Sequence, residues 1–456
     1  MGEKQATHAY VWGYNNTGEL GLGHAGRVFS PRPAELPPGL VDLQGGANFT
    51  VALTSSGRIW TWGGNEHGQL GDGSRTARRE PRQIRLPDGH RAAAIAAGTD
   101  HVVVVTTRGD VVTWGRNHRG QLGTGDRDDR LAPRQVRCET VRKVAAGDGV
   151  CAAITSTGRL LTWGRNGQDQ LAQRGAVPAG HDVLRPKRAR QVDERVRAVD
   201  AGLRHLVVLT VEGEVLGFGV DATGQPVPRR IAVPARWGTV RQIAAGEDHT
   251  LALTSRGHVV VWGANDLGQL GVGNRSHRPS PVRVELPGAR GDATSIRTGH
   301  RHSLVLTDRH EVFAWGEGRF GAVGSGRPAP EGTSYLEPHR VPLRGVAVSR
   351  LAGGGYTSAV LVHRGPAVRL ELDPPRATGQ PGRDVRYRIR TVDAFGTDLG
   401  PAPAGVEVVV PGGTTRHTSR VGTAVFGPAI GTYSVVARAG HLIGRATLDV
   451  SKGGKR

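Results

Sequence analysis

One phrase of about thirty residues recurs through most of this 456-residue chain. The copy at residues 244–273 reads AAGEDHTLALTSRGHVVVWGANDLGQLGVG. Neighbouring copies lie 44 to 55 residues apart. Phe218-Gly219 marks one copy, and a Trp-Gly pair marks six others, at Trp12, Trp62, Trp114, Trp163, Trp262 and Trp315. A period of this length predicts a series of similar units that bury their apolar faces against one another.

Each copy has the pattern of short β-strands. The runs TLALT and HVVVW are rich in apolar and β-branched residues, and SRG between them is typical of a tight turn. The glycine-dense segment GANDLGQLGVG follows as a long turn, and SPVRVEL and VRQIAAG supply two further strands. Four strands in about fifty residues indicate one blade of a β-propeller.

The two ends of the repeated part complement each other. A second anchor, built around a Gly, a His and a Leu at fixed spacing, recurs around seven positions: Phe49, His101, Val150, His205, His249, His302 and Tyr356. The chain opens on the Trp half of a unit, and the repeat ends at residues 351–365 on the other half. Two halves in one sheet would close the ring and remove its exposed edges. We therefore predict an all-β fold in which residues 1–365 form a seven-bladed β-propeller.

The phrase AGEDHTLALTSRGHVVVWGANDLGQLGVG resembles the repeat of the regulator of chromosome condensation family, and the resemblance extends over residues 8–365. It implies a propeller. It does not select a function, because similar members include guanine-nucleotide exchange factors, chromatin binders, accessory domains of ubiquitin ligases and a secreted β-lactamase inhibitor.

Two adjacent units depart from the repeat. The unit at Phe218 lacks the Trp and the GQLG turn, and the preceding unit carries a long segment at residues 172–192. One hypothesis places a partner there, with charge from Arg185, Lys187, Arg188 and Arg190 and with Trp237 as an aromatic anchor. The alternative is decay of the repeat in a solvated loop, which propellers tolerate well.

The last unit also departs from the repeat, with a loop rich in Gly and Pro around residues 324–332. Arg319, Phe320 and Tyr335 are therefore further candidates for a partner-binding surface. The alternative is that the two rings cover the neighbouring unit that closes the propeller.

Residues 366–456 form a predicted second domain. They lack Trp and the Gly anchor, and alternating runs such as GVEVVV and TYSVVARAG are separated by turn clusters. This pattern favours a β-sandwich. The segments VDAFGTDL and GTYSVVARAG resemble bacterial immunoglobulin-like domains, and the ending SKGGKR is a basic tail.

The chemistry-bearing motifs are few. GLGHAG at residues 21–26 fits a dinucleotide-binding pattern, but it lies in a blade turn where no helix follows. His101, His205, His249 and His302 share one repeat position, and we expect them to bond to the backbone of the next blade and not to a metal. No catalytic motif is present and no cofactor is predicted, although a site of scattered residues stays open. With only Cys138 and Cys151, we expect free thiols.

The charge leaves two classes of partner open. The formal net charge is +20, and only five of the 60 basic residues are lysines, a bias that we attribute to a GC-rich, bacterial genome. The arginines are spread over most units, so nucleic-acid or chromatin-like binding is the alternative to our main hypothesis. That hypothesis is a monomeric, non-enzymatic scaffold whose blade loops bind another, acidic protein; an extracellular inhibitor or adhesion protein is one form of it. The start of the chain has no secretory signal and favours the cytoplasm, whereas the immunoglobulin-like resemblance favours the cell surface or the outside.

Overall fold

The computed structural model describes residues 8–362, except residues 176, 179, 222, 228, 327–333 and 344, and then the strands between residues 367 and 450. The chain divides into two compact units, Met1–Leu343 with Val348–Val362, and Arg344–Ala347 with His363–Arg456. In the described residues the regular structure is β-strand, apart from two short 3-10 helices, η1 (Pro87–Gly89) and η2 (Ala235–Trp237).

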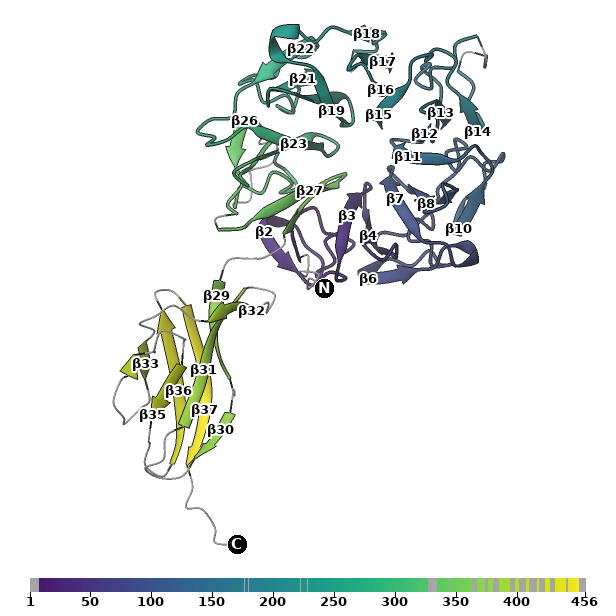
Figure 1. Cartoon of the computed structure of the whole chain (residues 1–456). Coiled ribbons are helices and arrows are strands. Elements are labelled where there is room, and N and C mark those ends of the chain that lie inside the picture. Colours follow the sequence, from purple (N-terminus) through teal and green to yellow (C-terminus); the bar gives the residue numbers. More distant parts are fainter. Residues whose placement is uncertain are drawn as a thin grey trace. The chain divides into compact units, whose positions relative to one another are not determined.

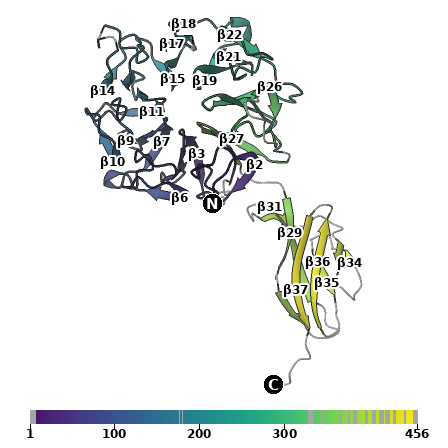
Figure 2. The same ribbon diagram turned by 180° about the vertical axis from the view of Figure 1, so that it is seen from behind.

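The first unit is a β-propeller of four-stranded antiparallel sheets arranged around a central channel (Figures 1 and 2). Five sheets each use four consecutive strands: β7 (Ala92–Ala97), β8 (His101–Thr106), β9 (Val111–Gly115) and β10 (Arg130–Val136); β11 (Val141–Ala146), β12 (Val150–Thr155), β13 (Leu160–Gly164) and β14 (Val183–Arg188); β15 (Val196–Ala201), β16 (His205–Thr210), β17 (Val215–Gly219) and β18 (Arg230–Ile231); β19 (Val240–Ala245), β20 (His249–Thr254), β21 (Val259–Gly263) and β22 (Arg278–Val284); β23 (Ala293–Thr298), β24 (His302–Thr307), β25 (Val312–Glu317) and β26 (Ser334–Arg340). The first strand of each sheet lines the channel.

The two ends of the propeller meet in one sheet. An eight-stranded sheet has the order β2-β1-β28-β27-β3-β4-β5-β6. Its strands are β1 (His8–Gly13), β2 (Val28–Ala34), β3 (Leu40–Gly45), β4 (Phe49–Thr54), β5 (Ile59–Gly63), β6 (Arg78–Ile84), β27 (Val348–Gly354) and β28 (Thr357–Val362). The first strand, β1, pairs with β28 over its full length, from His8 opposite Val362 to Gly13 opposite Thr357. This is the pairing of chain ends that the repeat predicts.

Neighbouring sheets are joined through the Trp of the repeat. The indole N–H of Trp163 donates to the backbone carbonyl of Gln121 in the preceding sheet at 2.9 Å, and four other tryptophans make the same bond: Trp12 to Ala322, Trp62 to Glu19, Trp114 to Gln69 and Trp315 to Gln269. These five indoles are fully buried. A glycine in the long turn of the preceding sheet leaves room for the indole. A Cβ on Gly71, for example, would lie 2.7 Å from the indole nitrogen of Trp114.

The GQLG turn holds the accepting carbonyl in place. In the loop after β5, the side-chain oxygen of Asn65 accepts from the amide of Leu70 at 3.0 Å, and that of Gln69 accepts from the amide of His67 at 2.9 Å. Asn65 and Gln69 are buried, and Leu70 is fully buried. The recurring polar residues of the repeat, Asn and Gln, therefore provide hydrogen-bond acceptors for backbone N–H groups of a buried turn, and buried N–H groups need such partners.

A second polar contact crosses the same joint. The Nε2 of His249 lies 3.0 Å from the hydroxyl of Ser303 in the next sheet, and that hydroxyl donates to the carbonyl of Gln269 at 2.9 Å. Three equivalent pairs are His101 with Cys151, His205 with Thr250 and His302 with Ser358, at 3.0, 3.0 and 2.8 Å. Because the Ser303 proton goes to the carbonyl, His249 Nε2 carries the proton of its own bond.

Two sequence predictions about the second anchor were wrong. The four histidines bond to side chains of the next sheet, not to its backbone, and they lie buried between sheets. Tyr356 does not occupy the histidine position, because Thr357 pairs with Gly13 as His249 pairs with Gly263. The misassignment arose because the extra glycine in GGGY shifts the strand register by one residue.

The irregular unit weakens one joint. In the sheet β15–β18 the long turn has Asp221 in place of the Asn, and its Gln225 is exposed, not buried; Asp221 accepts from the amides of Thr223 and Gln225. Trp262, which faces this turn from the next sheet, makes no equivalent indole bond among the described residues. It is 5% exposed, whereas the other five repeat tryptophans are 0% exposed. Loss of the turn sequence therefore leaves Trp262 without the indole bond of the other five tryptophans and slightly more exposed than they are.

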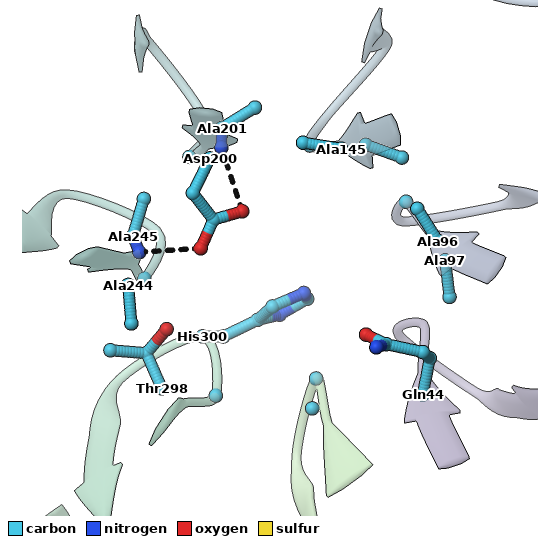
Figure 3. Close-up of a pocket in the computed structure, with 18 of the residues that line it drawn as sticks. Gln44, Ala96, Ala97, Ala145, Asp200, Ala201, Ala244, Ala245, Thr298 and His300 are labelled. Carbon is cyan, nitrogen blue, oxygen red and sulfur yellow. Dashed lines mark hydrogen bonds between the residues drawn. The ribbon is translucent and has the colours of Figure 1, made fainter. Parts of the chain in front are cut away.

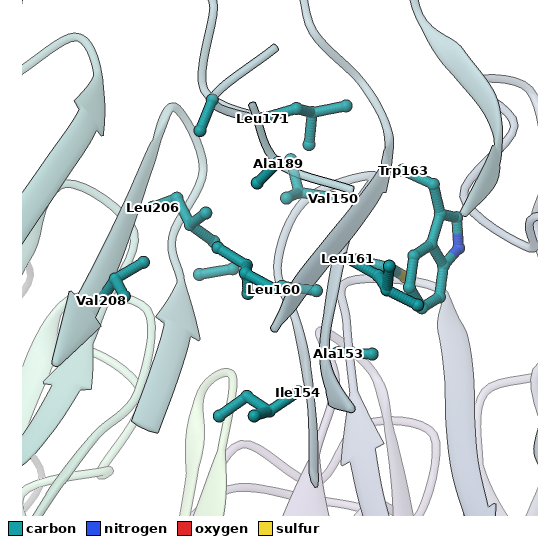
Figure 4. Close-up of a cluster of buried hydrophobic side chains, with 14 of the residues drawn as sticks. Val150, Ala153, Ile154, Leu160, Leu161, Trp163, Leu171, Ala189, Leu206 and Val208 are labelled. Carbon is teal, nitrogen blue, oxygen red and sulfur yellow. The ribbon is translucent and has the colours of Figure 1, made fainter. Parts of the chain in front are cut away.

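Apolar side chains fill the space between the sheets (Figure 4). One cluster combines Ile154 and Leu160 of β12 and β13 with Leu206 and Val208 of the neighbouring β16. All four are at most 1% exposed. Cys151 is buried in this cluster, Cys138 is exposed, and both are free thiols, as predicted.

The second unit consists of two sheets in its described strands. One has the order β29-β31-β32, with β35 also paired to β31, and the other has the order β30-β37-β36-β33-β34. The strands are β29 (Ala367–Asp373), β30 (Arg376–Gly379), β31 (Val385–Asp393), β32 (Asp398–Pro401), β33 (Glu407–Val409), β34 (Arg416–His417), β35 (Thr423–Phe426), β36 (Gly431–Ala439) and β37 (Leu442–Val450). Leu370, Leu372 and Ile389 from one sheet and Ala437 from the other are buried.

The buried histidines predict loss of stability in mild acid. Burial lowers the pKa of His101 and of His205 to about 4, and of His249 and of His302 to about 3. Because these values lie below the unfolded value of 6.5, stability is fully present above pH 6.5 and is lost as the pH falls toward the folded pKa values. The free energy of unfolding should fall by about 1.4 kcal/mol per pH unit for each histidine.

Urea unfolding between about pH 7.5 and about pH 5 measures this effect, in a range where most carboxylates stay ionised. Replacing the exposed His24 with Gln is the control and should leave the pH profile of the parent unchanged. A midpoint that does not move over this range would contradict the buried, neutral state of the four rings.

Candidate functional site

The loops between the first and second strands of the sheets form one continuous face around the channel, which we call the mouth face. Backbone bonds link each loop to the next: Ala47 to Thr99, Thr99 to Gly147, Asp148 to Gly202, Leu203 to Glu247, Glu247 to His300 and His300 to Gly355, with N···O distances of 2.7 to 3.3 Å. Since strands within a sheet alternate in direction, the long turns after the third strands lie on the same face. The tight turns after the second strands lie on the opposite face, which we call the turn face.

Charged side chains of the mouth face are mostly paired. Arg116 lies 3.2 Å from Asp100, and Arg165 lies 2.8 Å from Asp148. Two pairs cross between sheets, Arg204 with Asp248 at 3.0 Å and Arg301 with Glu247 at 2.6 Å. The hydrogen bond that Arg301 donates to the Glu247 carboxylate raises the pKa of Arg301 above its usual value. The pairs neutralise the face locally and hold its loops in one arrangement.

The channel behind this face contains a cavity of about 450 Å³. Figure 3 shows Asp200 and His300 among the residues that line it, with small side chains such as Ala96, Ala145 and Ala244 around them. The Asp200 carboxylate accepts from the backbone N–H groups of Ala201 and Ala245 at 2.9 and 2.8 Å. Burial raises the pKa of Asp200, while these two bonds and the charge of Arg297 oppose the shift.

Arg297 connects the channel wall across the closing sheet. It extends from β23 and donates to the Gly353 carbonyl of β27 at 3.2 and 3.0 Å, and to the Leu43 carbonyl and the Gln44 side chain of β3. Gly353 and Gln44 are also the residues of the one parallel bridge between β27 and β3. A single guanidinium thus binds both sides of the line where the two four-stranded parts of the eight-stranded sheet meet.

An aromatic cluster lies on the mouth face beside this line. Phe320 contacts Tyr14 and Tyr356, with ring centroids 5.4 and 4.9 Å apart, and His300 lies 4.8 Å from Tyr356. The guanidinium carbons of Arg27 and Arg319 each lie 5.4 Å from the Phe320 centroid. The four rings are half-buried and the two arginines are exposed. We call these six residues the Phe320 cluster.

The sequence predictions found part of this cluster. Arg319 and Phe320 belong to it, and the Phe320 ring contacts Tyr14 and Tyr356 of the closing unit, which agrees with the alternative for this one ring. Tyr335 is not part of the cluster, because it lies near the start of the outer strand β26, where its ring is 4.6 Å from that of His339. Residues 327–333 of the predicted loop lie outside the described residues.

Sequence analysis did not single out Tyr14, Arg27 and His300 as site residues. A signal was present, because Tyr14 follows the Trp-Gly pair where other units have Gly64, Arg116 or Arg165. Tyr14 and Tyr356 are aromatic at two mouth-face positions of the closing unit where most other units have charged or small residues.

Three basic candidates of the long unit, Arg185, Lys187 and Arg188, lie on β14, and Arg190 follows that strand. Arg185 reaches across to the preceding sheet and covers Gly125, where a Cβ would lie 2.4 Å from its guanidinium. Lys187 and Arg190 are exposed, and Arg188 lies 3.9 Å from Asp193.

Trp237 lies in η2, in a connection between two sheets on the turn face. Its ring packs partly buried against the apolar cluster of β16 and β20, under the guanidinium of Arg236 at 5.2 Å. Its carbonyl lies 3.2 Å from Nδ1 of His258. The structure therefore gives Trp237 a packing role, and it places Trp237 and Phe320 on opposite faces.

Within the described ranges, no group of three or more His, Cys, Asp or Glu side chains is placed to hold a metal ion. The described helices are also too short and too polar to span a membrane.

Comparisons with known proteins agree with this architecture. The family model described as the RCC1-like domain matches residues 137–369, and the regulator of chromosome condensation (RCC1) repeat matches residues 8–53, 56–105 and 108–154. Yeast RCC1 (Prp20), solved bound to Kap60, has a TM-score of 0.69 and 22% identity over 79% of this chain and 89% of that one. Human WBSCR16 has a TM-score of 0.68 and 23% identity over 78% and 99%. Fold and site thus define a β-propeller of repeated four-stranded blades.

The chain belongs to the RCC1 repeat family. It is 35% identical to the ultraviolet-B receptor UVR8 of Arabidopsis thaliana over 319 residues, which is 70% of this chain and 62% of the receptor. It is 30% identical to the secretion-regulating guanine nucleotide exchange factor of Mus musculus over 72% of this chain and 63% of that protein. The matches therefore span a little under two thirds of these relatives.

The contacts of Arg297 predict a measurable role in holding together the two four-stranded parts of the eight-stranded sheet. Arg297→Gln removes its bonds to β27 and β3 and should lower the free energy of unfolding by about 1–3 kcal/mol in urea titrations. Arg297→Lys keeps the charge but not the fork of donors, so it should recover only part of the loss. Arg309→Gln, at an exposed turn, is the control. A parent-like stability of Arg297→Gln would show that these bonds do not help to hold β27 and β3 together.

Proposed function

We propose that this protein is a protein-binding propeller and that its contact surface is the mouth face, centred on the Phe320 cluster. The observation that carries the proposal is a group of half-buried aromatic rings flanked by two exposed arginines. Aromatic and arginine side chains are the residues that most often contribute strongly to binding at protein interfaces. The partner that fits best presents apolar side chains together with carboxylates.

The family supports this proposal in a general way. The names of two relatives describe a receptor and a guanine nucleotide exchange factor, and yeast Prp20 was studied for its binding to Gsp1p and histones. These roles depend on contacts with other molecules, and a rigid ring of loops can present the residues that make such contacts. From these relatives we infer one property for this chain, the capacity to bind another protein.

We further infer that the ring has seven blades. The eight-stranded sheet divides into two sets of four strands at the single parallel bridge between Gly353 and Gln44, and the other five sheets have four strands each. We place the end of the propeller near residue 365. For residues 366–456 we propose an immunoglobulin-like sandwich, which the two sheets of the second unit support.

The proposal is tested with a partner captured from cells of the native host and then purified. We expect Phe320→Ala to weaken its binding at least about tenfold in calorimetry, because the ring is the centre of the contact. Tyr335→Ala is the matched control, since it removes a half-buried ring from the same sheet outside the cluster, and it should change affinity by less than about twofold.

Trp237→Ala distinguishes the two faces. If it abolishes binding while Phe320→Ala binds like the parent, the partner uses the turn face and the proposal is wrong. Circular dichroism spectra and melting temperatures of all three variants should match the parent closely enough to exclude unfolding as the cause.

A further inference from the structure

The strands that line the channel all begin with a β-bulge. In β11 the pairing with β12 skips from Val141 to Lys143, so that Arg142 is the extra residue. The same shift leaves Arg197 as the extra residue of β15 and Arg241 as that of β19. A bulge redirects the side chain of its extra residue. The three arginines are exposed.

Arginine occupies this position in three successive sheets. The equivalent residues of the other four lining strands are uncharged: Val41, Ala93, Thr294 and Ser349. The positive charge is therefore concentrated on one arc of the ring, along β11, β15 and β19, which neighbour one another around the channel (Figure 2). Lys143, next to Arg142, adds a fourth charge. We call Arg142, Lys143, Arg197 and Arg241 the bulge arc.

The charges of the bulge arc are not neutralised. Arg142 donates to the carbonyl of Val196 at 2.7 Å, and Arg241 donates to that of Ala293 at 2.9 Å. Within the part of the chain that the structure describes, no carboxylate oxygen lies within 4.0 Å of any of the four cations. On another part of the ring, in contrast, Arg350 lies 3.7 Å from Asp42.

The cations are also close to one another. Burial and the charges of Arg142 and Arg197 lower the pKa of Lys143. Each guanidinium has five N–H donors. Among the described residues, Arg142 and Arg241 each donate to one carbonyl and Arg197 to none, so most donors are available to a ligand. Planar guanidinium groups match the oxygen spacing of phosphoryl groups, to which they donate in pairs.

We propose that the bulge arc binds a compact anion with several phosphoryl groups, at the end of the channel on the turn face. Asp200 on the same strand as Arg197 carries a carboxylate farther along the channel, where it repels an anion and keeps it at the level of the bulges. The site is separate from the Phe320 cluster on the mouth face, and it does not depend on the proposed protein partner.

Calorimetry of the full chain with inorganic tripolyphosphate tests the proposal at two salt concentrations. We expect saturable binding with one anion per chain, weakened by salt because the contact is electrostatic. Replacing Arg142, Arg197 and Arg241 together with Gln should weaken it at least about tenfold. The matched control replaces Arg58, Arg108 and Arg309 with Gln, which removes the same charge from exposed turns of the same face and should retain binding.

Equal losses in the two triple variants, or no saturable binding by the parent, would overturn the proposal. If the triple variant fails to fold, Arg197→Gln replaces it, since the Arg197 guanidinium makes no hydrogen bond or ion pair with the residues that the structure describes, and its loss removes charge alone. Unchanged binding by this variant would also contradict the proposal.

Two further arms identify the source of the phosphoryl groups. Vesicles of phosphatidylcholine with a phosphoinositide test a lipid headgroup. Vesicle binding that depends on the bulge arc would identify the ligand as the phosphorylated headgroup of a membrane lipid. A single-stranded oligonucleotide tests nucleic acid. Stronger binding to the oligonucleotide, reduced equally by both triple variants, would indicate diffuse attraction to a polyanion and would contradict a specific site.

Discussion

The propeller depends on one backbone carbonyl at each of five joints between neighbouring sheets. At four joints this carbonyl accepts both the indole N–H of the next Trp and the hydroxyl or thiol of the residue opposite that Trp: Glu19, Gln121, Gln269 and Ala322. In the turns of Gln69, Gln121 and Gln269 a buried Asn and Gln position the carbonyl. Ala322 offers its carbonyl from a turn without them, so the Asn and Gln support this bond but are not required for it.

The partners across each joint match in polarity. His faces Cys, Ser or Thr at four joints, whereas Phe49 and Val102 share one apolar cluster, and Val150 and Leu206 share another. If the hydroxyl were replaced by an apolar group, the His N–H would be a buried donor without an acceptor. If the His were replaced by Val, the hydroxyl oxygen would lose the N–H that donates to it. Each sheet is therefore matched to its neighbour, and the surface loops are left to vary. The Phe320 cluster and the bulge arc both use positions outside these joints.

The sequence predicted the period, the strands, the paired chain ends and the packing role of Trp, because each follows from local patterns repeated many times. It did not predict the partners of the histidines, since these lie 45 to 56 residues away in the next unit. Tyr356 was placed one residue out of register by an extra glycine. Of the Phe320 cluster, only Arg319 and Phe320 were candidates, because Tyr14 and Tyr356 come together only when the ring closes.

A double-mutant cycle at one joint tests the matching of partners most directly. His249→Val and Ser303→Leu reproduce the pair that the chain uses at Val150 and Leu206, and urea unfolding measures each single variant and the double variant. The matched-joint account predicts that each single change costs about 1–3 kcal/mol, and that the double variant is at least about 1 kcal/mol more stable than the sum of the two losses implies. Losses that add to within about 0.5 kcal/mol would contradict it.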